Sequence, residues 1–251
     1  FGQGFVGKLA FPSANVSDRL EKTFTSVNFN MMIMVIYALI TIAIFGMWYY
    51  ARYEGNFLPS PKKTFNPMMI VAIVILVPGT QFAANFIANL TGYIRPDWLQ
   101  QYNELFETSG ITDTTFVTVL YSVILAPICE ELIFRGVTMR CARKALPFAL
   151  ANLMQAALFG LFHLNWIQGI YAFALGIVLG YVCERGGSIY YSIGLHLLFN
   201  LWGTLSGFFP DPGNSVVVFV VAIVVTIVSL VAGFVLFNKG RRKLPINSTG
   251  I

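Results

Sequence analysis

Charged residues are scarce in this 251-residue sequence: Lys, Arg, Asp and Glu make up 11% of it, whereas 57% of it is hydrophobic. A soluble domain typically has about 25% charged and ~45–50% apolar residues. The shortage of charge excludes an ordinary soluble domain and predicts a chain surrounded by lipid. The net charge of +5 would also suit a nucleic-acid-binding protein. Because Lys and Arg set the orientation of lipid-embedded chains, no nucleic-acid partner is expected.

Cysteine is scarce as well. The three cysteines, Cys129, Cys141 and Cys183, are an odd number and lack the spacing of a metal site. We expect ordinary buried thiols, with no role in a metal centre.

Long apolar runs, by contrast, dominate the chain. Seven of them reach the ~17–25 residues that a transmembrane helix needs. They lie at about residues 31–50, 67–90, 114–138, 147–165, 166–183, 188–208 and 214–237. We therefore predict an all-α, polytopic helical integral membrane protein with about seven transmembrane helices. Its expected parts are an N-terminal interfacial segment (1–30), one transmembrane domain (31–238) and a basic C-terminal tail (239–251).

The basic residues between these runs predict an orientation. Lys and Arg follow the first, third, fifth and seventh runs, whereas the loop at 91–113 is net acidic and those at 164–166 and 207–214 lack Lys and Arg. The positive-inside rule then places the C-terminus in the cytoplasm. We expect an integral protein of a prokaryotic plasma membrane.

A few ionisable residues interrupt the apolar runs. A central Asp or Lys in a membrane helix costs at least ~2.5–3.5 kcal/mol on insertion scales, so such residues face the bundle interior and usually have a function. The sites are Glu130 with Glu131, Arg135, His163 and His196, and the two histidines are the only ones in the chain.

The first site is the motif EExxxR. Glu131 and Arg135 are four residues apart, so on a helix they share a face and can pair. Glu130 points about 100° away from Glu131 and is left free, which suits a general base. A purely structural charge cluster at a helix end is the alternative.

The two histidines each have a partner one helical turn away. Phe159 precedes His163 by four residues, where its ring can pack against the imidazole. His196 and Asn200 leave their helix together and can reach one substrate atom, a pair that could stabilise an oxyanion. Alternatively, His163 is a satisfied buried histidine, and His196 with Asn200 is a polar clamp between helices.

Another polar stripe, made by Gln81, Asn85 and Asn89, occupies the 67–90 run. We interpret it as the wall of a wet cavity. One carboxylate, two histidines and an asparagine on three different helices would form a hydrolytic site that needs no Ser or Cys nucleophile.

In this order, EExxxR, FxxxH and HxxxN resemble the CAAX-protease and bacteriocin-processing family (CPBP or Abi), which are polytopic intramembrane endopeptidases. The resemblance covers a motif core at 114–205. It implies an all-helical membrane protease, a hydrolase of CAAX-protease type, acting on a membrane protein or on a lipidated or hydrophobic peptide. Its eukaryotic members trim prenylated CAAX tails, and its prokaryotic members are linked to bacteriocin maturation and immunity.

The resemblance also implies roles for single residues. Glu130 and His163 would activate a water, and His196 and Asn200 would bind the oxyanion. The residues with supporting roles would be Glu131, Arg135 and Phe159.

A zinc site is the open alternative to this metal-free mechanism. Glu130, His163 and His196 could supply a Glu/His/His zinc shell. The sequence has no H-E-x-x-H helix, however, and a ligating Glu130 would leave no separate base. We therefore favour a glutamate-type enzyme without a cofactor.

The expected activity is hydrolysis of peptide bonds inside the membrane. A non-catalytic membrane scaffold with the same fold is the first alternative, and a proton- or ion-coupled transporter is the second. One conflict accompanies the prediction: regular helices would place Glu130 and His163 on the order of 10–15 Å apart in depth. We expect an irregularity, either a kink at Pro127 or a deeper start of the run at 147–165.

Overall fold

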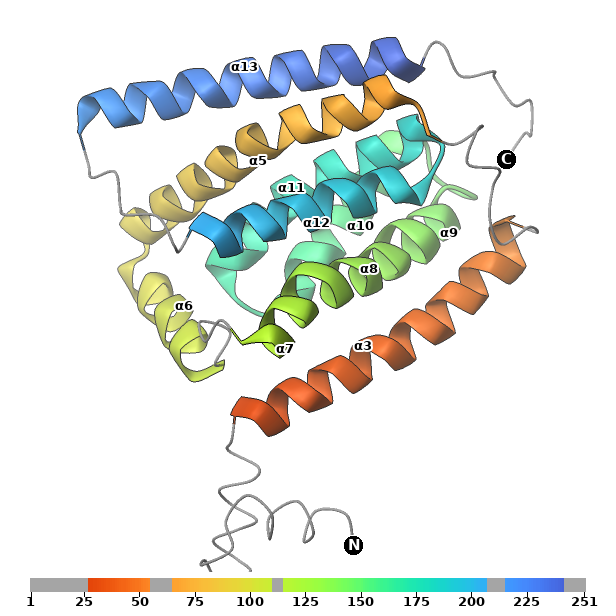
Figure 1. Cartoon of the computed structure of the whole chain (residues 1–251), viewed down its shortest axis with the longest axis horizontal. Coiled ribbons are helices and arrows are strands. Elements are labelled where there is room, and N and C mark those ends of the chain that lie inside the picture. The colour runs from red at the N-terminus through yellow and green to blue at the C-terminus, as the bar shows by residue number, and fades with distance from the viewer. Residues whose placement is uncertain (1–26, 55–64, 110–114, 207–214, 242–251) are drawn as a thin grey trace, which may run out of the picture.

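The computed structural model describes residues 27–54, 65–109, 115–206 and 215–241, and every regular element within these ranges is helical. The predicted all-α class is confirmed. Figure 1 shows α13 beside α5 along one edge of the bundle, α3 along the opposite edge and α6 across one end. The elements are α3 (Val27–Tyr49), η1 (Tyr50–Glu54), α5 (Pro67–Ile94), α6 (Pro96–Ser109), α7 (Phe116–Val119), η2 (Leu120–Leu125), α8 (Ala126–Glu131), η3 (Leu132–Met139), α9 (Arg140–Ala142), α10 (Phe148–Phe162), α11 (Trp166–Gly186), α12 (Ile189–Ser206) and α13 (Val216–Arg241).

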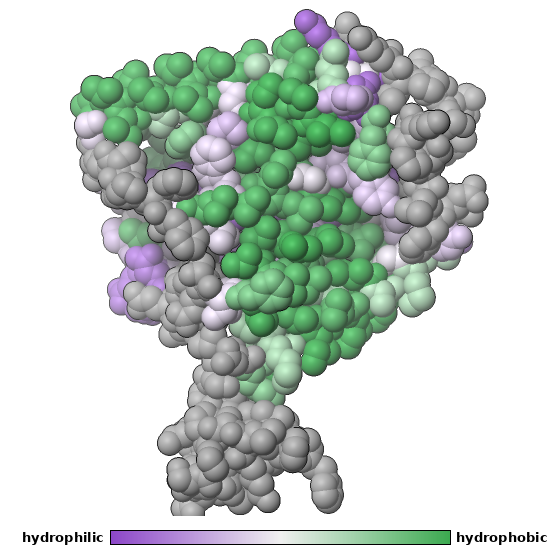
Figure 2. All heavy atoms as spheres, viewed as in Figure 1, coloured by the Kyte–Doolittle hydropathy of each residue, from purple (hydrophilic) through white to green (hydrophobic). Residues whose placement is uncertain are grey.

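Each of the seven predicted membrane segments contains a helix in the described part of the chain. Among the described residues, five helices are long and apolar enough to cross a bilayer: Phe29–Arg52, Pro67–Ile94, Phe116–Ala142, Trp166–Gly186 and Val216–Arg241. The other two segments form α10, which has only 15 residues, and α12, which has 18. Hydrophobic residues cover the middle of the molecule and hydrophilic ones gather toward two opposite ends (Figure 2). The protein is thus an integral membrane protein, as predicted.

Most of the predicted N-terminal interfacial segment and C-terminal tail lies outside the described residues. Helix α3 begins at Val27, inside the predicted 1–30 segment, and α13 continues to Arg241, inside the predicted 239–251 tail.

Basic residues join the helices at one end of the bundle. The Arg140 guanidinium donates a 3.2 Å hydrogen bond to the Tyr49 hydroxyl and so links α9 to α3. Arg143 pairs with Glu184 at 3.1 Å and links the end of α9 to α11. Arg140 and Arg143 thus each connect two helices at this end of the bundle.

Helix α5 contains a proline, and a side chain of α13 repairs the resulting break. Pro78 disturbs the regular helical bonding around it. The Gly79 N–H donates to Ser229 Oγ at 2.8 Å, and this hydroxyl donates in turn to the Ile75 carbonyl. The Ser229 hydroxyl is thus inserted between a donor and an acceptor that would bond each other in a regular helix, and it ties α13 to α5.

The segment from Phe116 to Ala142 switches from α-helical to π-helical winding twice and returns to α-helical winding each time. The π-helical η2 and η3 flank α8, whose last two residues are Glu130 and Glu131. Wider turns of this kind often occur at functional sites. They provide part of the irregularity that the sequence predicted near Pro127.

Helix α10 provides the rest. Its 15 residues span about 22 Å, less than the ~30 Å thickness of a bilayer core. The helix ends at Phe162 with His163 as its C-cap, and Leu164 turns the chain with a left-handed φ of 53°. Asn165 then caps α11 by accepting a hydrogen bond from the Gln168 N–H. His163 therefore lies in the tight connection between the short α10 and α11.

The cysteine prediction is only partly right. Cys129 and Cys183 are buried, but Cys141 is exposed. Cys141 lies in α9, next to the basic end of the bundle, where side chains reach the surface.

The close contact between α10 and α11 leads to a prediction about stability. A Cβ on Gly160 would lie 2.5 Å from the Gly169 carbonyl oxygen, a backbone atom that cannot move aside without separating the helices. Gly160→Ala should therefore lower the thermal midpoint in detergent by on the order of 5 °C, since overpacking outweighs the better helix propensity of Ala. A thiol-reactive dye that reports exposure of Cys129 and Cys183 can measure it.

Gly194→Ala is the matched control, because a Cβ on this α12 glycine meets nothing within 4 Å. It should keep or slightly raise the midpoint. Equal midpoints for Gly160→Ala and the unmodified protein would show that the α10–α11 contact is not tight.

Candidate active site

A fully buried ion pair lies at the centre of the bundle. Arg135 Nη1 donates to Glu131 Oε1 at 2.9 Å, and neither side chain has any exposed surface. Arg135 Nη2 also donates to the Gly176 carbonyl on α11 at 3.2 Å. The Arg135 guanidinium lies 4.4 Å from the centre of the Phe159 ring on α10. The pair predicted within one helix therefore also joins three helices.

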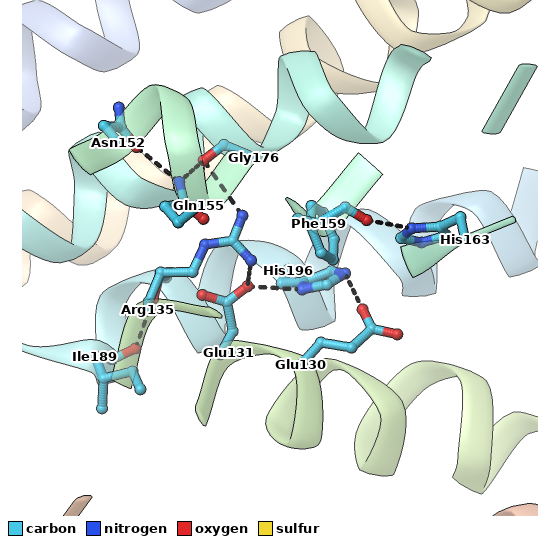
Figure 3. A network of polar contacts seen from close by, with 11 residues as sticks. Glu130, Glu131, Arg135, Asn152, Gln155, Phe159, His163, Gly176, Ile189 and His196 are labelled. Carbon is cyan, nitrogen blue, oxygen red and sulfur yellow. Dashed lines mark hydrogen bonds and ion pairs between the residues drawn. The ribbon is translucent and has the colours of Figure 1, made fainter. Parts of the chain in front are cut away.

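Glu131 has a second partner, on α12. Its Oε1 accepts a 2.9 Å hydrogen bond from His196 Nδ1. Because an ionised carboxylate can only accept, Nδ1 carries the proton, and Nε2 is left to face the cavity. His196 Nε2 lies 3.6 Å from Glu130 Oε2, beyond hydrogen-bond length. Figure 3 shows the His196 ring between the two glutamates.

His163 is fixed by the end of its own helix. The last carbonyls of a helix have no intrahelical donor. The His163 N–H bonds to the Gly160 carbonyl, and the Phe159 carbonyl is instead bonded to the His163 side chain, with Nδ1 at 2.8 Å. A carbonyl oxygen only accepts, so Nδ1 is the protonated nitrogen and Nε2 of the neutral ring is an acceptor.

The Phe159 ring separates and orients the two histidines. It is 1% exposed, and its centre lies 4.9 Å from that of His163 and 5.8 Å from that of His196, both in edge-to-face geometry. The predicted contact between Phe159 and His163 is present, and Phe159 also contacts His196 and Arg135.

Asn200 bonds to a carbonyl that the break in the neighbouring helix leaves free. In the π-helical register, the Ala126 N–H bonds to the Tyr121 carbonyl, five residues earlier. The next donor in this register would be residue 127, but Pro127 has no N–H. The Ser122 carbonyl therefore lacks its helical donor, and Asn200 Nδ2 supplies one at 2.8 Å.

One cavity of about 650 Å³ contains all four predicted catalytic side chains. Glu130 comes from α8, His163 from the end of α10, and His196 with Asn200 from α12. Residues of α5, α6, α7, η2 and α11 complete its walls. The three motifs thus meet at a shared space inside the bundle.

The cavity lies toward the end of the bundle that α6 crosses, away from Arg140 and Arg143 at α9. There Arg95 donates two hydrogen bonds to Asp97, of 2.9 and 2.7 Å, and these bonds lower the pKa of the Asp97 carboxyl. The Arg95 guanidinium lies 4.3 Å over Trp98, which stacks on Trp166 at 5.3 Å. These contacts attach α6 to the start of α11, three residues after His163.

The described residues contain no ready-made zinc site, since no group of three His, Cys, Asp or Glu side chains among them is placed to hold a metal ion. His163 Nδ1 is bonded to a carbonyl and His196 Nδ1 to Glu131, so Nε2 of each ring is the nitrogen without these bonds. Zinc-ligating histidines commonly donate their other ring N–H in this way, so these bonds suit the zinc alternative as well as the metal-free mechanism.

Sequence reasoning missed the contacts between helices. It paired Glu131 with Arg135 but did not find His196 as a third member, and it did not find Gly176. A Cβ on Gly176 would lie 3.1 Å from Ala156 and 3.2 Å from Phe159, so a small residue is needed for this approach. Its position one helical turn before Gly180 is a small-xxx-small pattern that could have indicated the contact.

The buried pair predicts a large loss of stability when only one charge is removed. Arg135→Met should cost about 3–5 kcal/mol of the free energy of unfolding, because the Glu131 carboxylate would remain buried without its cation. Adding Glu131→Gln should restore part of this loss. Denaturant unfolding in mixed micelles measures both variants.

The control is Arg95→Met, which removes an arginine from an ion pair whose side chains are 48% and 53% exposed. Little change is expected because solvent screens such a pair. If Arg135→Met and Arg95→Met were equally mild, the buried pair would not hold the helices together.

Comparison with known families agrees with the position of the site. Residues 112–202 match the family described as type II CAAX prenyl endopeptidase, Rce1-like. No curated protein and no solved structure matches the chain. The matched residues contain the EExxxR, FxxxH and HxxxN motifs and exclude α5, α6 and α13. This core is therefore similar to the Rce1-like type II CAAX prenyl endopeptidases, and the family resemblance predicted from the three motifs is confirmed.

Proposed function

We propose that the protein is an intramembrane endopeptidase that cleaves a membrane-associated substrate, either a prenylated CAAX-type peptide or a hydrophobic segment. The observation that carries the proposal is the single cavity shared by Glu130, His163, His196 and Asn200. The family description of the 112–202 core supports the same reaction class. A scaffold would have no need for an acid, two imidazoles and an amide around one space.

In the proposed reaction, Glu130 acts as the general base. Its carboxylate takes a proton from a water held between it and His163 Nε2, while the water oxygen attacks the substrate carbonyl. The C–N bond then breaks, and the proton passes from Glu130 to the leaving amine. Water is thereby divided between the new carboxyl group and the new amine, and no covalent enzyme intermediate is needed.

His196 and Asn200 are proposed to stabilise the oxyanion. A side-chain amide nitrogen has two hydrogens, and Asn200 uses one of them on the Ser122 carbonyl. The other can be donated to substrate. When the His196 ring carries both protons, Glu131 accepts from Nδ1 and Nε2–H becomes the second donor. Glu131 and Arg135 act as positioning residues.

Replacing Glu130 tests its proposed role as the general base. Glu130→Gln should lower the cleavage rate of a quenched-fluorescence peptide ending in a prenylated CAAX sequence by about 10³-fold, because the amide cannot take the proton. Folding should persist, since Glu130 is not part of the Glu131–Arg135 pair. Activity in nanodiscs and the thermal midpoint are measured together.

Glu104→Gln is the control, because it changes an exposed glutamate on α6 in the same way. It should cleave at the normal rate. A Glu130→Gln protein that kept its biological phenotype would support the scaffold alternative, and solute uptake into peptide-free liposomes would support a transporter.

Removing metal ions tests whether the reaction needs zinc. Because the proposed reaction uses no metal ion, cleavage should continue at an unchanged rate after dialysis against EDTA and 1,10-phenanthroline. Metal content is measured on the same sample by mass spectrometry. Activity that disappeared with the metal and returned with added zinc would refute the glutamate-type mechanism.

A further inference from the structure

The cavity has a polar wall that the proposed chemistry leaves unused. Gln81 and Asn85, on α5, line it together with the catalytic residues. We propose that these two side chains form a subsite that hydrogen-bonds the main-chain amide groups of the substrate peptide. This inference rests on the proposed function only in taking a peptide as the ligand. Helix α5 lies outside the 112–202 segment that matches the family.

Gln81 has the hydrogen-bonding deficit expected of an empty subsite. Its side chain is buried, with only 8% of the residue exposed, and its Oε1 has no hydrogen-bond partner within the described part of the chain. Its Nε2 reaches Asn85 Oδ1 only at 3.5 Å, the weak limit of a hydrogen bond. A buried acceptor without a donor costs free energy, so a ligand that supplies an N–H is favoured.

The position of Gln81 places that ligand beside the catalytic centre. Its Nε2 lies 3.9 Å from where a Cβ of Gly203 would be, so α5 meets α12 at this glycine. Gly203 is three residues after Asn200, and both line the cavity. A peptide whose scissile carbonyl is held by Asn200 would therefore pass Gln81 with a neighbouring amide.

The charges around the cavity favour a neutral amide over a charged group. No Lys or Arg occurs among the described residues that line it, so a substrate carboxylate would find no permanently charged cation there. The charged or imidazole side chains of the lining are Glu130, His163 and His196, all assigned to the reaction. Gln81 and Asn85 offer neutral donors and acceptors, which match the alternating N–H and C=O of a peptide.

Equilibrium binding tests the subsite independently of catalysis. The probe is a fluorescent farnesylated CAAX peptide whose scissile amide is replaced by an uncleavable methylene-amine. It is titrated onto the full chain in nanodiscs. Gln81→Met keeps the length of the side chain but removes its polar atoms. It should weaken binding about tenfold. The control is Asn89→Leu. The sequence placed Asn89 in the same polar stripe as Gln81, but it does not belong to the cavity lining, so this variant should bind within about twofold of the unmodified protein.

Probe peptides in which single amides are replaced by esters identify the group that is bound. An ester lacks the N–H, so at one position the unmodified protein should lose about tenfold in affinity, and Gln81→Met should lose nothing further there. This ester series on the unmodified protein does not depend on how the variant folds. Equal affinities for the unmodified protein and Gln81→Met, ester losses identical in both at every position, or no binding of the probe at all would overturn the inference.

Cleavage of the natural-amide peptide separates this inference from the proposed function. Gln81→Met should raise KM about tenfold and leave kcat within about threefold, because a subsite that binds substrate and transition state equally affects KM alone. A protein that binds the probe through Gln81 but never cleaves the peptide would refute the proposed activity and leave the subsite standing.

Discussion

The site depends on the buried pair of Glu131 and Arg135. Removing two charges from water costs several kcal/mol each, and the cost is offset only where further hydrogen bonds satisfy the remaining polar atoms. Here the compensation is incomplete, because Glu131 Oε2 and Arg135 Nε find no hydrogen-bond partner among the described residues. Apolar side chains of similar size would fill this space at lower cost. The pair is better explained by what it positions, since Glu131 also holds the His196 ring.

Other site residues are held in place by bonds to backbone groups that are freed where helices end or are interrupted. Inside a bilayer, a backbone group freed by a break has no water to bond and must find a protein partner. Ser229 bridges the break at Pro78, Asn200 bonds the Ser122 carbonyl beside Pro127, and the His163 side chain bonds the Phe159 carbonyl near the end of α10. Two of these three repairs use proposed catalytic residues. The same hydrogen bonds that allow the irregular backbone therefore also fix the orientation of the site.

The sequence predicts contacts within a helix far better than contacts between helices. The four-residue spacing is enough to pair Glu131 with Arg135 and Phe159 with His163, and both contacts are present. His196 is 65 residues from Glu131, and helical periodicity gives a side chain's direction without naming the helix it faces. For the same reason the fold class was predictable, whereas the shortness of α10 was not.

Hydrolysis inside a bilayer also requires water at the carboxylate. The cavity that could hold this water lies toward one end of the bundle. Its lining brings polar residues of α5 and α12 together with Glu130 and with residues of α6, the helix that crosses one end of the bundle. The basic residues are at the opposite end, where Arg140 and Arg143 join α9 to α3 and α11. The cavity and this basic cluster therefore lie toward different ends of the bundle. The polar side chains of its wall can hydrogen-bond either water or a peptide, so one set of residues could serve both needs.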